Sequence, residues 1–341
     1  MNKEHSEVDR QKLQELIKIR KRNNDFSWLI VDYLNNTPRL ITKELMEQVD
    51  EEGILSEDVL YSALLSGFLD LDAENNEDDS VLETDYLHYC VKKLDTSIYL
   101  KNLYYQHIKI PETSFGKWKL THDNYDPYEA FVYKDIVLTS EYQEIPQVGF
   151  FDELFEFPVV MENGHEWMAI KPNEIETMQP VINQVSGRVL TFGLGMGYFP
   201  YMVSLKENVT NITIVEKDKE VIRLFREIIL PQFQHKEKVE IINADAFDFA
   251  LKKLPHMAFN HAFVDLWHDV SDGLELYLKM KKLENLSKET NFHYWIEDSL
   301  LSGLRWQLFD MISTTSASFN EIVQRLSNNF LQDLAAFSIK V

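Results

Sequence analysis

The chain has 341 residues, 45% of them hydrophobic and 26% charged, which is a globular composition long enough for two or three folding units. It carries 56 Asp and Glu against 34 Lys and Arg, so its formal net charge is -22. Proteins that follow a nucleic-acid backbone need cations to replace the counterions of the phosphates, and this composition argues against that class.

The beginning of the chain, MNKEHSEVDR, is charged and lacks the apolar stretch of a secretion signal. No window approaches the ~20 apolar residues that a membrane span requires. We therefore expect a soluble, cytoplasmic protein with no membrane partner. The single cysteine, Cys90, excludes an internal disulfide and a thiolate metal cage.

Residues 1–99 are predicted to form a helical N-terminal region. Apolar residues recur there at spacings of three and four, for example in 13–19 and 59–65, as they do on one face of a helix. The acidic run within 70–85 is predicted to be a solvated loop, because nothing in the sequence makes its carboxylates converge on a cation.

Residues 100–172 are predicted to form a small β-region. Short runs rich in aromatic and β-branched residues, YYQHIKI, GKWKL, AFVYKDIVL and EWMAI, are separated by turn-forming residues. This pattern indicates a small antiparallel sheet, and Asn163-Gly164 is a candidate hairpin turn.

Residues 173–341 alternate between apolar strands and amphipathic helices. This alternation predicts an α/β fold with a mostly parallel, Rossmann-like sheet and helices on both faces. The predicted strands are 188–192, 211–216, 239–244, 261–266 and 292–297. Residues 300–334 are mainly helical in pattern, and AAFSIKV at the end is predicted to be a strand.

A glycine-rich turn links the first of these strands to the next helix. Gly193, Gly195 and Gly197 allow a sharp turn and the close approach of a ligand to the main chain. Glu216 ends the next strand, 21 residues beyond Gly195, at the spacing of a carboxylate that binds ribose hydroxyls. A nucleoside site is therefore predicted, and the alternative is that the glycines only permit tight helix packing.

Finer features bear on the kind of nucleoside. Tyr198 stands where a dinucleotide fingerprint needs a small residue, so the pattern is GxGxG. Asp245 ends the third strand, where it can accept a hydrogen bond from an adenine amino group, and Ala246 and Phe247 follow it to flank the ring.

The runs RVLTFGLGMGY, IVEKDKEVI and IINADAFDF together resemble the class I S-adenosylmethionine-dependent methyltransferases, and among these the spermidine synthase-like branch. The resemblance covers about residues 174–298. It implies that S-adenosylmethionine is the cofactor, with the glycines at its methionine end, Glu216 at the ribose and Asp245 at the adenine. The implied cofactor-binding residues are Gly193, Gly195, Gly197, Glu216, Asp245 and Ala246.

The segment 168–174, MAIKPNE, lies about one helix before the first core strand. It is predicted to connect a strand to a helix, with Asn173 as the cap and Glu174 in the first turn. In the fold that the chain resembles, such a segment often forms a lid over the methionine moiety, and this is the alternative.

The predicted catalytic residues are Asp265, His268 and Asp269, which follow the fourth strand. Ligands in open parallel sheets lie beyond the carboxyl ends of the strands, and a histidine or carboxylate there can remove a proton from a nucleophile. FVDLWHD is similar to the matching segment of catechol-type O-methyltransferases. On that likeness Asp265, Glu297 and Asp298 are candidate Mg²⁺ ligands, although His268 could be a plain surface residue and Glu297-Asp298 could cap a helix.

The aminopropyltransferases, which use decarboxylated S-adenosylmethionine, are the second family likeness. In them an aspartate at the position of His268 deprotonates the amine, and Tyr105-Gln106 resembles their YQ motif. A third alternative is a non-catalytic protein that binds S-adenosylmethionine and recruits a partner through its N-terminal helices.

The sequence thus predicts an S-adenosylmethionine-dependent methyltransferase. The net charge favours a small or medium acceptor that is neutral or cationic, and disfavours nucleic acid. Dependence on Mg²⁺, formation of a homo-oligomer and a protein partner for residues 1–99 stay open.

Overall fold

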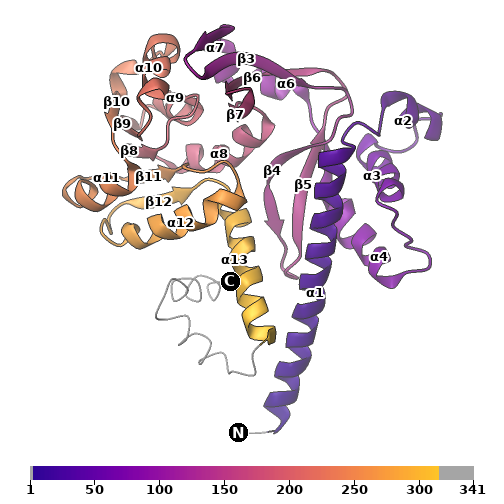
Figure 1. Ribbon diagram of the computed structural model, residues 1–341. Helices are drawn as coiled ribbons and strands as arrows, with labels where there is room; N and C mark the ends of the chain where they lie inside the picture. The colour runs from indigo at the N-terminus through magenta and orange to yellow at the C-terminus, as the bar shows by residue number, and fades with distance from the viewer. Residues whose placement is uncertain (1–2, 315–341) are drawn as a thin grey trace.

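A five-stranded parallel sheet forms the centre of the C-terminal half in a computed structural model that describes residues 3–314 (Figure 1). Its strand order is β10-β9-β8-β11-β12, and every neighbouring pair is parallel. The strands are β8 (Gly187–Phe192), β9 (Val209–Glu216), β10 (Val239–Asn243), β11 (His261–Val264) and β12 (Asn291–Tyr294). The predicted α/β, Rossmann-like fold is confirmed.

The central strands are buried on both faces, as parallel strands covered by helices must be. Val189, Leu190, Ile212 and Ile214 are fully buried. The helical segments of this half are α8 (Pro172–Gln184), α9 (Tyr198–Ser204), α10 (Lys219–Leu224), η2 (Phe225–Ile229), η3 (Leu230–Gln232), η4 (Lys236–Lys238), α11 (Ala246–Lys252), η5 (Leu254–His256), α12 (Val270–Glu284) and α13 (Glu297–Thr314). The chain leaves β8 toward β9 on one side and returns to β11 on the other, so the sheet reverses its order at β8.

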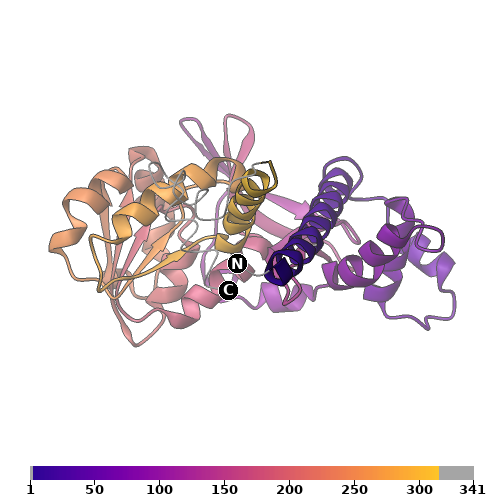
Figure 2. The same ribbon diagram turned by 90° about the horizontal axis from the view of Figure 1, so that it is seen from below.

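Two smaller sheets lie between the five-stranded parallel sheet and the N-terminal helices, as Figure 2 shows. One is antiparallel and contains β2 (Thr113–Phe115), β3 (Trp118–Tyr125), β6 (Phe155–Glu162) and β7 (His165–Ala169). The other pairs β4 (Phe131–Leu138) with β5 (Glu144–Phe150), and β5 with the parallel strand β1 (Val91–Lys93). The Asn163-Gly164 hairpin is confirmed, because Glu162 pairs with His165 across a turn in which both central residues have positive φ.

The predicted strand YYQHIKI is wrong over its whole length: its first four residues belong to helix α7 (Leu103–His107), which follows α6 (Thr96–Leu100), and residues 108–110 form no strand. The side chain of Asn102 caps α7 by accepting a hydrogen bond from the Tyr104 N–H, and the Tyr104 ring is fully buried. The cap and the buried ring therefore outweigh the β-propensity of the tyrosines.

The N-terminal helices are α1 (Lys3–Asn36), α2 (Lys43–Val49), α3 (Glu57–Phe68), α4 (Glu77–Val81), the π-helix η1 (Leu82–Leu87) and α5 (His88–Cys90). The prediction of an acidic loop over 70–85 is wrong from Glu77 onward. Asn76 caps α4 by accepting hydrogen bonds from two backbone N–H groups, and the carboxylates that follow lie in the first turn, where the helix dipole favours them.

The N-terminal helices share one buried core with β5, which includes Phe26, Ile30, Val148 and Phe150. Helix α13 lies beside α1 and the β4–β5 hairpin (Figure 1). Within residues 3–314, no helix has both the length and the apolar character needed to cross a membrane. The strand predicted for residues 335–341 lies outside the described residues.

Candidate functional site

A cavity of about 200 Å³ opens at the carboxyl ends of the parallel strands, beside the point where the sheet reverses its order. This is the place where open α/β sheets bind their ligands. The predicted site residues that line it are Gly193, Gly195, Glu216, Asp245, Ala246, Asp265 and His268. Residues from six different segments of the chain thus meet at one cavity, and four of these segments contain the predicted site residues.

The three glycines of the turn have different roles. Gly193 has a φ of +94°, and a Cβ there would lie 1.9 Å from the carbonyl oxygen of Asp265. Gly197 has a φ of +74°, and its Cβ would lie 2.3 Å from the ring of Phe225. These two glycines permit close packing, as the alternative interpretation proposed, whereas Gly195 faces only the flexible side chain of Met168 and lines the cavity.

Glu216 ends β9 and is tied to the glycine turn. Its Oε2 accepts a hydrogen bond from the Leu194 N–H at 3.2 Å, and its Oε1 accepts one from the Asp218 N–H at 2.8 Å. Burial raises the pKa of Glu216, and these backbone hydrogen bonds oppose that shift. The carboxylate is therefore fixed in the cavity wall, with lone pairs left to accept further hydrogen bonds.

Asp245 is the N-cap of α11. Its Oδ1 accepts hydrogen bonds from the N–H groups of Phe247 and Asp248, each at 3.0 Å. The cap orients the carboxylate at the cavity, and Phe247 lines the cavity beside it. Lys279 lies over the ring of Phe247, with its Nζ 3.9 Å from the ring centre. Local helix chemistry thus explains why the third strand ends in this sequence.

Asp265 follows β11 and contributes a carboxyl group to the cavity. Burial raises its pKa to about 7, the charge of Glu216 adds to the shift, and His268 opposes it. A carboxyl group with that pKa exchanges protons near neutral pH, which is the property of a general base.

Glu174, in the first turn of α8, is a second buried carboxyl group, and the charge of Asp265 acts on it. Burial raises its pKa well above the usual range, and the charge of Asp265 adds to the shift. Its Oε2 is buried and has no hydrogen-bond partner among the described residues. The sequence predicted the first-turn position correctly but contained no sign of this burial. The predicted cap was wrong, because Lys171 is the N-cap and Asn173 already lies inside α8.

His268 and Asp269 differ in their relation to the cavity. His268 is exposed at the cavity edge, where its Nδ1 lies 3.1 Å from Oδ2 of Asp272. Asp269 is the N-cap of α12, accepts a hydrogen bond from the Ser271 N–H at 2.7 Å, and is absent from the cavity lining. Asp269 therefore has a structural role that the sequence analysis did not assign to it.

The three candidate Mg²⁺ ligands do not assemble. Glu297 accepts a hydrogen bond from the Tyr277 hydroxyl at 2.8 Å and lies 3.4 Å from the Lys281 ammonium. Asp298 is in the first turn of α13, where its N–H donates to Asp135, whereas Asp265 lines the cavity. Among residues 3–314, no group of three His, Cys, Asp or Glu side chains is arranged to hold a metal ion. The alternative, that Glu297 and Asp298 cap a helix, is close to what the structure shows: both lie in the first turn of α13, where the helix dipole favours acids.

The residues that resemble the YQ motif lie on helix α7. The hydroxyl of Tyr105 donates a hydrogen bond to the carbonyl oxygen of Ile170, between β7 and α8, and the cavity lining does not include Tyr105 or Gln106. In the described structure this tyrosine supports the segment next to the cavity.

Comparison with known proteins adds little to this geometry. No protein-family model matches the chain, and no curated protein matches it. A solved structure, spermidine synthase from Thermotoga maritima, is similar over 36% of this chain and 45% of its own length, with 18% sequence identity and a TM-score of 0.27. The match thus spans less than half of that protein, and a TM-score this low does not establish a family. The Rossmann-like fold is established by the strand order of the sheet itself.

Proposed function

We propose that the protein is an S-adenosylmethionine-dependent methyltransferase that acts on a small or medium acceptor, neutral or cationic. The observation that supports this proposal most is the meeting of Glu216, Asp245 and Asp265 in one cavity beside the glycine turn. These carboxyl groups stand at or just after the ends of three different parallel strands, and all three face the same cavity.

The residues of the cavity fit such a cofactor. Gly195 brings the main chain to the cavity wall, and Glu216 offers carboxylate oxygens to a ribose. Asp245 and Phe247 offer an acceptor and an apolar face to a base. When it is bound, S-adenosylmethionine supplies an electrophilic carbon on sulfur.

The protein's own contribution to the reaction is a proton acceptor and a negative field. With a pKa of about 7, Asp265 is ionised in about half of the molecules at neutral pH and can take a proton from the acceptor nucleophile. Glu174 places a second carboxyl group near it. The ionised form of Asp265 favours an acceptor that carries an amine or another cationic group.

Aminopropyl transfer from decarboxylated S-adenosylmethionine is the second candidate. The observation that favours it is the carboxyl group of Asp265 in the cavity, because an amine binds to a carboxylate through its cationic group. The two reactions release different products, S-adenosylhomocysteine and methylthioadenosine. Incubation of the protein with each donor and a panel of small amines, with the nucleoside products separated by chromatography, distinguishes them.

Calorimetry with S-adenosylmethionine and S-adenosylhomocysteine tests the cofactor assignment. We expect the wild type to bind, and Glu216→Ala to bind about 10- to 100-fold more weakly, because one or two hydrogen bonds to a charged group are lost. Glu220→Ala is the matched control, since Glu220 is exposed on α10 and does not line the cavity.

The outcomes separate the alternatives. If the wild type binds neither compound, the cofactor assignment is wrong. If Glu216→Ala binds as tightly as the wild type, Glu216 does not hold the ribose. Binding without turnover of any acceptor by either donor supports the non-catalytic alternative.

A further inference from the structure

Met168 of β7 lies against the glycine turn of the candidate site. Its sulfur accepts a hydrogen bond from the Met196 N–H, with a distance of 3.1 Å between N and Sδ. A Cβ built on Gly195 would lie 2.2 Å from that sulfur and 2.4 Å from the methyl carbon of Met168. The thioether therefore occupies the space directly above the glycine that faces the cavity.

A β-bulge directs Met168 to this position. Val160 of β6 pairs with Met168, but Met161 pairs with Glu166, so Trp167 is an extra residue on β7. A bulge of this kind bends a strand and redirects its side chains, and bulges are enriched beside active sites. As a result, the consecutive residues Trp167 and Met168 both line the cavity, although side chains of a regular strand would point to opposite faces.

The cavity is small for the ligand that its walls fit. Its volume is about 200 Å³, whereas pockets for small molecules and cofactors usually measure about 300–1,000 Å³. Met168 is one of the side chains that line this cavity. Methionine suits a displaceable position, because its unbranched side chain has three rotatable bonds and its sulfur is only a weak hydrogen-bond acceptor.

We propose that Met168 is an internal occupant of the ligand site, which satisfies the Met196 N–H in the free protein and must turn away before a ligand binds. The group that replaces it on the ligand is a hydrogen-bond acceptor. This inference rests on the proposed function, because it takes the ligand to be S-adenosylmethionine or its product. It adds that the affinity of the site is set by the population in which Met168 has already moved.

The first test needs no ligand. Hydrogen exchange of the Met196 amide, followed in the free protein, reports the contact with the sulfur directly. We expect faster exchange in Met168→Ala than in the wild type. Met168→Val serves as a second variant, because valine suits a strand but is too short to reach the turn.

The second test measures the affinity for S-adenosylhomocysteine by calorimetry. We expect Met168→Ala and Met168→Val to bind about five- to tenfold more tightly than the wild type, which corresponds to an open population of about 10–20% in the free protein. Met161→Ala is the matched control, because Met161 is a half-buried methionine on the neighbouring strand β6 that does not line the cavity. It should bind like the wild type.

Equal or weaker binding by both Met168 variants, with a wild type that binds, overturns the inference and leaves the proposed function intact. Unchanged exchange of the Met196 amide in both variants also overturns it. If neither the wild type nor the variants bind S-adenosylhomocysteine, the proposed function fails and the inference fails with it. Tighter binding together with faster exchange supports both.

Discussion

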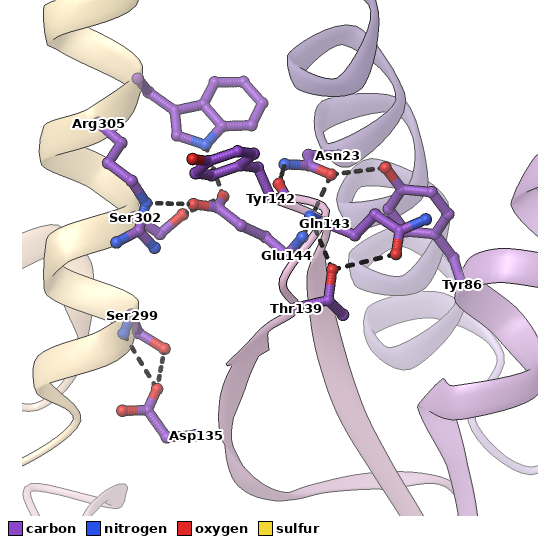
Figure 3. A network of polar contacts seen from close by, with 11 residues as sticks. Asn23, Tyr86, Asp135, Thr139, Tyr142, Gln143, Glu144, Ser299, Ser302 and Arg305 are labelled. Carbon is purple, nitrogen blue, oxygen red and sulfur yellow. Dashed lines mark hydrogen bonds and ion pairs between the residues drawn. The ribbon is translucent and has the colours of Figure 1, made fainter. Parts of the chain in front are cut away.

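Glu144 joins the C-terminal helix α13 to the β4–β5 hairpin, and its replacement tests how the two halves of the molecule are held together (Figure 3). It is the first residue of β5 and is only 5% exposed. Its carboxylate accepts hydrogen bonds from Ser302 Oγ at 2.5 Å, Arg305 Nε at 2.7 Å and Trp306 Nε1 at 2.9 Å. Three donors on successive turns of one helix therefore depend on a single side chain.

We expect Glu144→Ala to destabilise the protein strongly, because Ser302, Arg305 and Trp306 lose their hydrogen-bond acceptor. The Arg305 side chain is 22% exposed, so its guanidinium loses its counterion in a mostly buried place. Removing one partner of a buried ion pair typically costs about 3–5 kcal/mol. We therefore expect the free energy of unfolding to fall by about 3–5 kcal/mol.

Urea denaturation, followed by both circular dichroism and tryptophan fluorescence, measures this change, and coincidence of the two transitions checks that unfolding is two-state. Glu141→Ala is the control, because Glu141 is exposed in the same hairpin, and its change should be under about 0.5 kcal/mol.

The loss of unfolding free energy in the double variant Glu144→Ala/Arg305→Ala should be smaller than the sum of the losses in the two single variants, because no unpaired guanidinium of Arg305 remains. A loss under about 0.5 kcal/mol for Glu144→Ala alone would refute the reasoning.

Three further predictions concern the glycine turn, the carboxyl group of Asp265 and a pair of histidines. Gly193→Ala should be destabilised far more than Gly164→Ala in urea denaturation. Both glycines have φ near +90°, but a Cβ on Gly193 meets a backbone carbonyl oxygen and one on Gly164 meets nothing within 4 Å; similar losses would contradict the packing role of Gly193. Asp265 keeps its proton to about pH 7 when folded but only to about pH 4 when unfolded, so its contribution to stability is full at low pH and is lost as pH rises through 7. Relative to Asp265→Asn, the wild type should lose about 2–3 kcal/mol in the free energy of unfolding between about pH 5 and about pH 8, and an unchanged difference would contradict the raised pKa. His261 and His293 share a hydrogen bond of 3.0 Å, and burial lowers the pKa of both, so stability is lost as pH falls below about 6.5. Thermal unfolding of His293→Asn should depend less on pH over this range than that of the wild type.

The parallel sheet and the cofactor end of the candidate site could be predicted because their signals are local. Apolar runs of four to six residues define the strands. The glycine turn follows β8, Glu216 is the last residue of β9, and Asp245 stands two residues after β10, so parallel pairing alone brings them to one edge. Asp265 follows the same rule on the fourth strand.

Other features depended on contacts between distant parts of the chain. Residues 104–107 have strand-forming side chains, but a cap and a buried ring make them helical. Asp269 follows β11 as Asp265 does, yet it became a helix cap because α12 begins directly after it. Glu174 and Met168 lie on the segment before the sheet, which the sequence predicted to be a connection or a lid; the burial of Glu174 and the contact of Met168 with the glycine turn arise only through folding.

The sequence by itself determined which backbone could form: strands in alternation with helices, a turn that only glycines can make, and acids at strand ends. The tertiary structure alone decided what surrounds those groups. Burial raised the pKa of Asp265, the bulge at Trp167 turned Met168 onto the glycine turn, and Glu144 bound a helix more than 150 residues away in the chain. The periodicity of a sequence shows which side chains share one face of a helix or strand. The polarity of the surroundings, the hydrogen-bond partners and the free space around a side chain depend on distant segments that only the fold brings together.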